Sequence, residues 1–458
     1  MIVSDTIAAI STAMGQAGIG IIKISGPIAI KGSLLFFRKK DKTPLNPKNI
    51  VSHKMIHGWI VDKESKIIDE VLWVCMKKPY SYTGDDVAEI HTHGSHVVLQ
   101  AILEIFLTVP DIRLAEPGEF TRRAVLNGRM DLTHAEALQD IISAQTQKTL
   151  QFTSSHLSGQ FRTLITRLKD NIFKCLTQIE ATIDFPDDMM DESPIVLSLM
   201  PYIDQLNLLI KSYEQISIYR DGFRVVIIGR PNVGKSSILN CLLAKDRAIV
   251  SQHPGTTRDI IDAQLIIDNI PITLYDTAGI HQTSDTIEQK GILRAKELIK
   301  SSHLILFIIE ADRCLSSDDF FVHQEIKDQT WILCANKIDR VKKIQIDNIP
   351  TQWPEPICIS ARYDIGMTFL KKAIVNHITQ QNSDLPDPEF MINLRQKKCL
   401  EKARDALMQA QNAYIDNLPM DCVEIDIRLA LDALGEITGA VYYEHVLDEI
   451  FSSFCIGK

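Results

Sequence analysis

The stretch GRPNVGKSS, residues 229–237, constrains the fold of this chain more than any other feature does. It fits the pattern GxxxxGK[ST], follows the β-branched run RVVIIG and precedes a helix-prone segment. Gly229 and Gly234 let the backbone curl so that its N–H groups face a phosphate. Lys235 can neutralise phosphate charge, and the Ser236 hydroxyl suits Mg²⁺. The sequence therefore predicts a nucleotide site between a buried strand and a helix.

Apolar runs alternate with helix-length segments between Arg224 and Ile378. The runs are RVVIIG, LIIDNIPITLYD, HLILFII, TWILCANK and ICISA. Such spacing is typical of buried parallel strands in an α/β sheet. We therefore expect an α/β domain here, with the phosphate motif at the end of one of its strands.

Two further motifs suit the phosphates and their metal. DTAG ends the run ITLY, so Asp276 is placed to hold Mg²⁺ through water and the Gly279 N–H lies near a γ-phosphate. In SQHPGTTRD, residues 251–259, a threonine would complete the Mg²⁺ shell when the γ-phosphate is present. Thr257 is the predicted ligand, and Thr256 is the alternative.

Two motifs suit a guanine base. NKID ends the run TWILCA, and Asp339 can accept two hydrogen bonds from the guanine edge that adenine cannot offer, while the Lys337 stem covers the base. SAR follows ICI and brings the Ala361 N–H to the guanine oxygen. The nucleotide is therefore predicted to be GTP. The predicted GTP-binding residues are Asn232, Val233, Gly234, Lys235, Ser236, Ser237, Ser251, Gln252, His253, Pro254, Gly255, Thr256, Thr257, Asp276, Thr277, Ala278, Gly279, Asn336, Lys337, Asp339, Ser360, Ala361 and Arg362.

One expected side chain is missing from the DTAG region. Many switch GTPases orient the attacking water with a glutamine just after the DxxG glycine, but Ile280 stands there and cannot form that hydrogen bond. The acidic residues of HQTSDTIEQKG, residues 281–291, are the candidates to replace it. An ordinary solvated carboxylate near a helix N-terminus is the alternative interpretation of this segment.

The segments on both sides of the α/β region have a helical pattern. The upstream segment is amphipathic until Pro186, and downstream Leu400, Ala403 and Leu407 share one helical stripe. The first part of the chain contains short alternating runs such as GIGIIKISG, which indicate an α+β domain. We predict residues 1–120 as that domain, 121–216 and 381–458 as two halves of a helical domain, and 217–380 as the inserted α/β domain.

The composition of the 458 residues narrows the class of protein. The formal net charge of −9 argues against coating nucleic acid by bulk electrostatics, although the local stretches FRKKDK and LRQKKCLEKAR are basic. The chain has no apolar run of roughly 18 residues and no signal-peptide pattern. Nine cysteines without a CxxC pair suit a reducing compartment. We expect a cytoplasmic protein.

The chain resembles the MnmE (TrmE) family of tRNA-modification GTPases, in the TrmE-Era-EngA-like class of translation-factor GTPases. The resemblance rests on DTIAAISTAMGQAGIGIIKISGP, YSYTGDDVAEIHTHGS, EPGEFTRRAVLNGRMDLTHAEAL, DFPDD, LALDALGEITG and the terminal FCIGK, besides the GTPase motifs. It implies a multidomain α/β fold. A Ras-like P-loop GTPase domain is inserted into an all-helical domain, preceded by an α+β domain that binds folate and forms a homodimer.

The resemblance also implies a reaction and a partner. Family members work with the flavoprotein MnmG (GidA) in a heterotetramer, and only that partner carries FAD. Together they add an aminomethyl or carboxymethylaminomethyl group to C5 of the wobble uridine of certain tRNAs. A 5-formyl or 5,10-methylene derivative of tetrahydrofolate supplies the carbon.

Several site residues follow from the resemblance alone. It implies Glu288 as the catalytic residue that orients water, with Ser236 and Thr257 as Mg²⁺ ligands. A K⁺ ion replaces an arginine finger in the family. The implied K⁺ ligands are Asn232, Ser251, His253 and Thr256. The implied folate-binding residues are Lys23, Glu89, Arg129 and Lys458. Lys23 stands where an arginine is common in the family, so the charge remains but the bidentate fork is lost.

The terminal FCIGK permits three interpretations. A lipid anchor on Cys455 is disfavoured because CIGK has glycine and lysine after the aliphatic residue. The cysteine could simply end a helix, since free cysteine is often buried. The resemblance implies instead that Cys455 is a catalytic thiol.

A different function for the whole chain is the alternative to tRNA modification. In this interpretation the protein is an Era-like GTPase switch in ribosome assembly, without carbon transfer.

Overall fold

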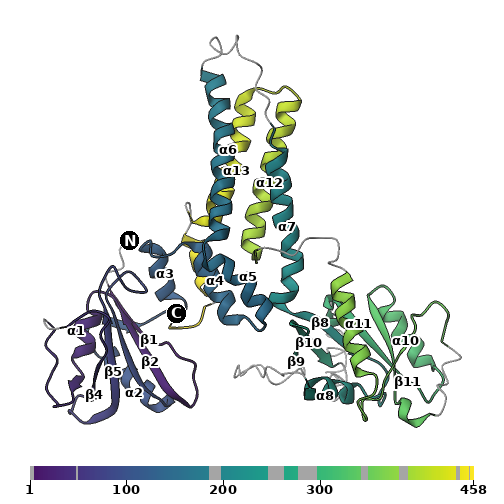
Figure 1. Ribbon diagram of the computed structural model, residues 1–458, viewed down its shortest axis with the longest axis horizontal. Coiled ribbons are helices and arrows are strands. Elements are labelled where there is room, and N and C mark those ends of the chain that lie inside the picture. The colour runs from purple at the N-terminus through teal and green to yellow at the C-terminus, as the bar shows by residue number, and fades with distance from the viewer. Residues whose placement is uncertain are drawn as a thin grey trace, which may run out of the picture. The chain divides into compact units, whose positions relative to one another are not determined.

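The computed structural model of the chain divides into two compact units. The first comprises Met1–Ile142, His156–Leu206 and Lys398–Lys458, and the second comprises Ser143–Ser155 and Asn207–Lys397. Each unit is therefore assembled from segments that are distant in the sequence (Figure 1). The structure describes residues 5–47, 50–184, 198–245, 262–276, 297–341, 349–380, 390–439, 444–452 and 454–457.

A seven-stranded sheet of order β3-β4-β5-β6-β2-β1-β7 begins the first unit. All neighbouring strands are antiparallel except β1 and β7. Successive side chains of β5 point to opposite faces of the sheet. Val71, Trp73 and Cys75 are therefore buried in the core with α1 and α2, whereas Leu72 is 40% exposed. The elements are β1 (Thr6–Ile10), β2 (Ala17–Ser25), α1 (Ala29–Leu34), β3 (Phe37–Lys39), β4 (Ile56–Val61), β5 (Ile67–Met76), β6 (Val87–Gly94), α2 (His96–Leu107) and β7 (Ile112–Leu114).

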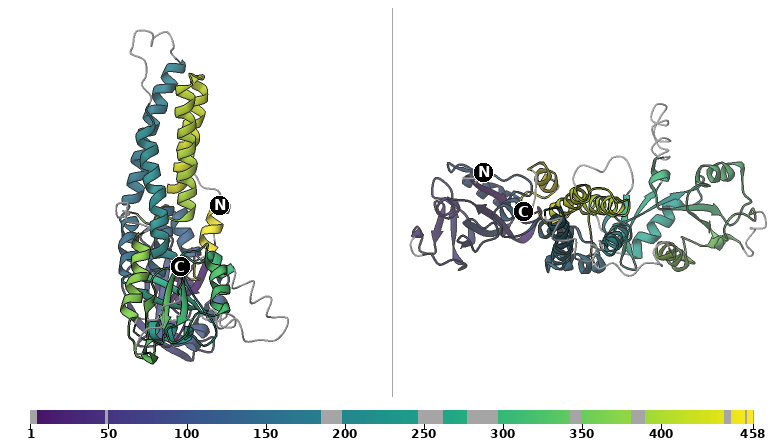
Figure 2. Two further views of the ribbon diagram at one scale, coloured as in Figure 1. Left: turned by 90° about the vertical axis from the view of Figure 1, so that its right-hand side faces the viewer. Right: turned by 90° about the horizontal axis from the view of Figure 1, so that it is seen from above.

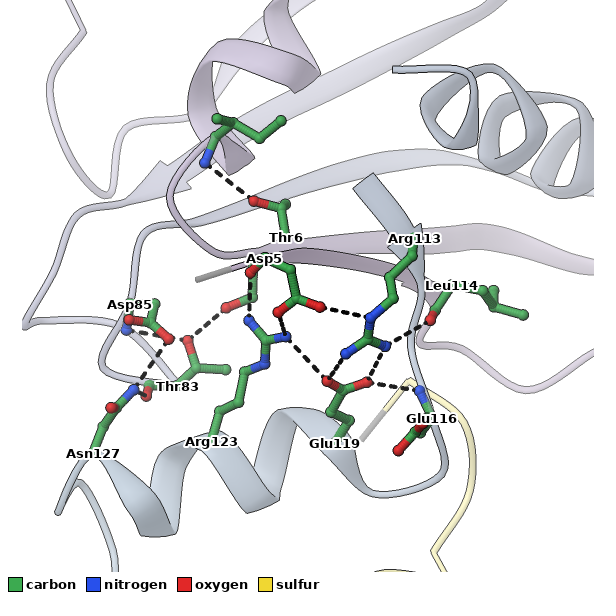
Figure 3. Close-up of polar contacts among 12 residues, drawn as sticks. Asp5, Thr6, Thr83, Asp85, Arg113, Leu114, Glu116, Glu119, Arg123 and Asn127 are labelled. Carbon is green, nitrogen blue, oxygen red and sulfur yellow. Dashed lines mark hydrogen bonds and ion pairs between the residues drawn. The ribbon is translucent and has the colours of Figure 1, made fainter. Parts of the chain in front are cut away.

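A group of charged side chains, of which Glu119 and Arg123 are buried, ties the start of β1 to helix α3 (Glu119–Leu126) (Figure 3). We call Asp5, Arg113, Glu119 and Arg123 the Asp5 cluster. Arg113 donates to Asp5 Oδ2 at 2.6 Å and to Glu119 Oε1 at 2.6 Å. Arg123 donates to Asp5 Oδ1 at 2.8 Å and to Glu119 Oε1 at 3.0 Å. Glu119 also accepts from the Glu116 N–H at 2.8 Å, so one carboxylate fixes the turn that precedes α3.

Replacing Glu119 by Gln is expected to destabilise this part of the first unit by about 1–3 kcal/mol at neutral pH, because Arg113 and Arg123 lose one of the two carboxylates that they share. Burial raises the pKa of Glu119, but the bonds from Arg113, from the Glu116 N–H and from Arg123 outweigh it, so the pKa lies below the ordinary 4.5. A carboxylate with a lowered pKa stabilises the fold above its unfolded pKa and loses this effect as the pH falls through the folded pKa. Amide hydrogen exchange in β1 and α3 measures the effect.

The matched control for this prediction is Glu64→Gln, because the Glu64 side chain is 73% exposed and its ion pair with Lys66, at 2.7 Å, lies on the surface. That variant should exchange like the wild type. The Glu119→Gln difference should shrink as the pH falls below about 4.5, where Glu119 of the unfolded wild-type chain becomes protonated. A difference that is the same at acidic and neutral pH would contradict the electrostatic explanation.

Helices α6 (Gln160–Asp184) and α13 (Met420–Thr438) run side by side in the first unit (Figures 1 and 2). Each buries one apolar stripe with a spacing of three or four residues. Arg428 also forms an ion pair with Glu180. The α6 stripe consists of Phe161, Ile165, Leu168, Ile172, Leu176 and Ile179. Other helices of the chain's helical segments are α4 (Leu132–Ser143), α5 (Gln147–Leu157), α7 (Met200–Asp221), α12 (Leu394–Ile415) and α14 (Glu444–Ser452).

A six-stranded sheet of order β13-β12-β11-β8-β10-β9 forms the centre of the second unit. Strand β11 buries alternate residues in two cores, with Leu306 facing α8 and α11 and Phe307 facing α10. Burial on both faces explains why these strands read as continuous apolar runs. The elements are β8 (Phe223–Ile228), α8 (Lys235–Lys245), β9 (Asp262–Ile267), β10 (Ile270–Asp276), β11 (Leu304–Glu310), α10 (Ser317–Ile326), β12 (Trp331–Asn336), the 3₁₀ helix η3 (Ile338–Arg340), β13 (Ile357–Cys358) and α11 (Met367–Gln380).

The expected multidomain α/β fold is confirmed, with one correction in the run LIIDNIPITLYD. This run forms two strands, and β9 is antiparallel to β10, so the prediction of parallel strands throughout was wrong at β9. The turn between them places Asp268 at φ 49° and Asn269 at φ 62°. Asp and Asn tolerate this left-handed conformation, which a two-residue hairpin turn requires. Within the described part of the chain, no helix has both the length and the apolar character of a membrane span.

Candidate functional site

The phosphate motif lies at the carboxyl end of β8, the strand between β11 and β10. Gly229 has φ 155°, and a Cβ there would meet the Ile308 carbonyl oxygen. Gly234 has φ 99°, and a Cβ there would meet the Asn336 side chain. Both glycines therefore permit a close approach that other residues would prevent. The loop leads directly into α8, which begins at Lys235.

The two side chains that follow the loop are already oriented by polar contacts. The Lys235 amine donates to the Gly229 carbonyl at 2.8 Å and to the Arg230 carbonyl at 2.9 Å. Burial lowers the pKa of Lys235, and the nearby Asp276 carboxylate opposes this effect. The Ser236 hydroxyl donates to Asp276 Oδ2 at 2.9 Å. A hydroxyl and a carboxylate beside a phosphate loop are the hard oxygen ligands that suit Mg²⁺.

The guanine motifs meet at the ends of β12 and β13. The Asn336 side chain donates to the Val233 carbonyl at 2.9 Å and accepts from the Ala361 N–H at 3.2 Å. The Ser360 hydroxyl donates to Asp339 Oδ1 at 2.6 Å. The structure thus brings the NKID and SAR motifs into contact with each other and joins both to the phosphate loop.

The structure describes some of the remaining predicted GTP-site residues and leaves others outside its described ranges. Asn232 lies in the loop at φ 66°, Ser237 is exposed on α8, and the Arg362 guanidinium lies 5.5 Å from the Tyr363 ring centre. Thr277, Ala278, Gly279 and Glu288 lie outside the described residues, as does the whole stretch 251–257. That stretch includes the predicted ligands Ser251, His253, Thr256 and Thr257.

Two of the predicted folate residues are neighbours on the first sheet. Lys23 of β2 and Glu89 of β6 are direct cross-strand partners. The Lys23 amine lies 4.8 Å from the Tyr82 ring centre and 5.5 Å from that of Phe120. Glu89 Oε2 lies 3.3 Å from His91 Nε2. Sequence reasoning did not connect Tyr82 and Phe120 with this pair, because Tyr82 precedes β6 and Phe120 lies on α3, and only the folding of the chain brings them to Lys23.

The third predicted folate residue, Arg129, lies after α3 and not on the sheet strands that carry Lys23 and Glu89. It is exposed in the turn between α3 and α4 and lines an open cleft of about 650 Å³. Arg162 and Lys169 of α6 line that cleft too. The fourth predicted folate residue, Lys458, lies outside the described residues.

The segment after α14 folds back onto the first sheet domain and carries Cys455. The Gly118 N–H donates to the Cys455 carbonyl at 3.4 Å, and Ile456 forms a β-bridge with Pro117. The Ser11 hydroxyl donates to the Gly457 carbonyl at 2.9 Å. The Cys455 residue itself is exposed. The cysteine therefore lies past the end of the helix, in a chain segment held by its backbone.

A phosphate loop at the end of β8, joined to the NKID and SAR motifs at the ends of β12 and β13, places this chain in the class of P-loop GTP hydrolases. Family models take the assignment further: residues 6–129 match the GTP-binding protein TrmE N-terminus, and residues 132–455 match the MnmE helical domain. The chain belongs to the MnmE family of tRNA modification GTPases.

Individual relatives extend over the whole chain. A tRNA modification GTPase MnmE from Alkaliphilus oremlandii is 39% identical to this chain over 464 residues, and the match covers 100% of each chain. Its counterpart from Carboxydothermus hydrogenoformans is 40% identical, with 99% of each chain covered. A solved structure similar to this chain is that of Aquifex aeolicus Era bound to GDP.AlF4-. The match covers 41% of this chain and 67% of the Era chain, with 29% sequence identity and a TM-score of 0.29.

Proposed function

We propose that this GTPase acts in tRNA modification. With the flavoprotein MnmG (GidA), it adds an aminomethyl or carboxymethylaminomethyl group to C5 of the wobble uridine of certain tRNAs. The observation that carries the proposal is the likeness, at 39% identity over the full chain, to proteins named tRNA modification GTPase. We place the reaction in the cytoplasm, where its tRNA substrates are.

The GTP site in this proposal uses the motifs at the strand ends. Lys235 and the loop N–H groups bind the phosphates, and Ser236 with Thr257 holds Mg²⁺, which neutralises charge that develops on the phosphates. Asp339 accepts two hydrogen bonds from guanine, and the Ala361 N–H donates to its oxygen. The hydrogen bond from Ser360 to Asp339 supports the orientation of that carboxylate, and the bond from the Ala361 N–H to Asn336 keeps this N–H beside the NKID motif.

A K⁺ ion is proposed to supply the charge that an arginine finger supplies elsewhere, with Asn232, Ser251, His253 and Thr256 as its ligands. Glu288 then orients the attacking water. Asn232 is exposed in the phosphate loop, which suits an ion that also touches the nucleotide. The other residues named here lie outside the described part of the chain, so their roles rest on the family resemblance.

GTP hydrolysis in KCl is expected to be roughly tenfold or more faster than in NaCl at equal ionic strength, because the cation stabilises developing phosphate charge and must fit its ligand cage. Steady-state phosphate release measures both rates. The control is Asn232→Ala, which should lower the rate in KCl and leave the rate in NaCl nearly unchanged. Equal wild-type rates in the two salts would remove the K⁺ assignment.

The carbon is proposed to come from a 5-formyl or 5,10-methylene tetrahydrofolate derivative bound by Lys23, Glu89, Arg129 and Lys458. A carboxylate can read the donor edge of a pterin, and cations suit the glutamyl tail. The direct pairing of Lys23 with Glu89 supports a shared site for these two. Cys455 acts as the catalytic thiol. FAD belongs to the partner.

We also propose an assembly and a division of the chain. Residues 1–120 form the folate-binding domain that pairs two copies, 121–216 and 381–458 form the helical domain, and 217–380 form the Ras-like GTPase domain. Two copies of MnmG complete a heterotetramer.

Mass spectrometry of wobble uridines tests the whole proposal. Cells that lack this gene should lose the C5 aminomethyl-type groups, and the wild-type gene should restore them. Unchanged tRNA with a defect in ribosome assembly would favour an Era-like switch instead.

A further inference from the structure

Glu310 occupies the last position of β11 and is only 7% exposed. The parallel register pairs it directly with Asn336, the last residue of β12. The next residue after that partner is Lys337 of the NKID motif. The sheet therefore places a buried carboxylate beside the loop that is assigned to read guanine.

Three cations converge on this carboxylate. Lys337 Nζ forms an ion pair with Glu310 Oε1. Arg230, inside the phosphate motif, has its Nη2 atom 3.7 Å from Glu310 Oε2, and Arg313 has its Nε atom 3.5 Å from the same oxygen. Arg313 approaches from the surface, since its side chain is 65% exposed, whereas those of Lys337 and Arg230 are 18% and 16% exposed.

The two inner cations also hold other parts of the site. The Lys337 amine donates to the Asn232 carbonyl of the phosphate loop at 2.6 Å. Arg230 lies 2.9 Å from Asp319, a fully buried carboxylate that caps α10. Lys337 and Arg230 thereby connect the guanine motif, the phosphate loop and α10, and Glu310 is the anion that both side chains share.

Fixing these side chains has an energetic consequence for binding. A lysine side chain loses rotamer entropy when it is held in one conformation. If the fold has already fixed it, the nucleotide does not have to order it on binding, and affinity increases through preorganisation.

We propose that Glu310 is a positioning residue for guanine-nucleotide binding. It holds Lys337 across the base site and Arg230 away from the phosphates, so that both loops keep their binding geometry before the nucleotide enters. The inference rests on the guanine-site assignment proposed above, and it makes Glu310 a determinant of affinity that does not itself touch the nucleotide.

Glu310→Gln tests the proposal because it keeps the size of the side chain and removes its charge. GDP and GTP affinities, measured by calorimetry, should fall roughly tenfold, equivalent to about 1.4 kcal/mol. The kcat at saturating GTP should stay within about twofold of the wild-type value, whereas the KM for GTP should rise. Unchanged affinity, or a loss confined to kcat, would overturn the proposal.

Three further variants keep the result interpretable. Glu310→Asp retains the charge and withdraws the oxygens by one methylene, so it remains measurable if Glu310→Gln does not fold, and we expect an intermediate loss of affinity. Arg313→Ala removes the exposed cation from the same carboxylate and should leave affinity within about twofold. The proposal would be contradicted if Glu310→Asp bound the nucleotides like the wild type while a folded Arg313→Ala bound them more weakly.

Lys337→Ala distinguishes a failure of this inference from a failure of the guanine-site assignment. If Lys337→Ala binds GTP like the wild type, the assignment itself is wrong. If Lys337→Ala weakens binding but Glu310→Gln does not, only the role of Glu310 is wrong. In the Lys337→Ala background, adding Glu310→Gln should have less effect than in the wild type, because the pair acts as one unit.

Discussion

Asp339→Asn is expected to weaken GTP binding by roughly 10²–10⁴-fold, because one of the two hydrogen bonds to the carboxylate is lost and the other loses its charged acceptor. Guanine offers its ring N–H and its amino group to the carboxylate, and an amide can accept from only one of them. The Ser360 hydroxyl, 2.6 Å from Asp339 Oδ1, can still donate to the amide oxygen, so the new side chain keeps its orientation. The change therefore alters recognition more than local structure.

Xanthosine triphosphate provides the reciprocal test of this expectation. Xanthine carries an oxygen where guanine has its amino group, so the amide of Asp339→Asn can donate to it. The variant should bind and hydrolyse xanthosine triphosphate better than the wild type does, as shown by competition binding and phosphate release. If the Asp339→Asn variant bound GTP as tightly as the wild type, guanine would have to be recognised by other residues.

Cys455→Ser is expected to abolish wobble-uridine modification and to leave GTP hydrolysis unchanged. A serine hydroxyl is a far weaker nucleophile than a thiolate at neutral pH, while the two side chains have nearly the same shape. The carbonyls of Cys455 and Gly457 accept hydrogen bonds from the Gly118 N–H and the Ser11 hydroxyl, so the substitution should not release this segment. Modification is measured by mass spectrometry of tRNA from cells that carry only the variant gene.

Cys422→Ser is the matched control, because Cys422 is also exposed but lies in the first turn of α13. This variant should retain both GTP hydrolysis and modification. A fully active Cys455→Ser would return the terminal motif to a structural role. Loss of GTP hydrolysis in Cys455→Ser would instead indicate a folding defect.

The phosphate and guanine motifs could be found from the sequence because each comes directly after a buried apolar run. Carboxyl ends of parallel strands meet at one sheet edge, so the order of the runs is enough to bring Asp276 and Asn336 to the loop. The antiparallel β9 could not be distinguished from a parallel strand by composition, because both are apolar. Only the Asp268–Asn269 turn pair signals it.

Other parts of the site depend on contacts that have no local signal. Glu310 ends an apolar strand, and nothing in the run HLILFII predicts that a neighbouring strand will bring Lys337 to it. The hydrogen bond between Ser11 and Gly457 joins residues 446 positions apart. Such pairs follow from the register and the folding of the whole chain, which periodicity and spacing do not determine.

The distance between α6 and α13 in the sequence sets an order for synthesis. A ribosome completes the α6 stripe long before it makes α13, and the larger segment of the second unit, Asn207–Lys397, lies between them. The second unit can fold as soon as its last strand and helix have emerged, whereas α6 must wait for its packing partner. A chain that stalls before residue 420 therefore carries a folded GTPase unit and an uncovered apolar helix, which is the kind of surface that chaperones and proteases recognise.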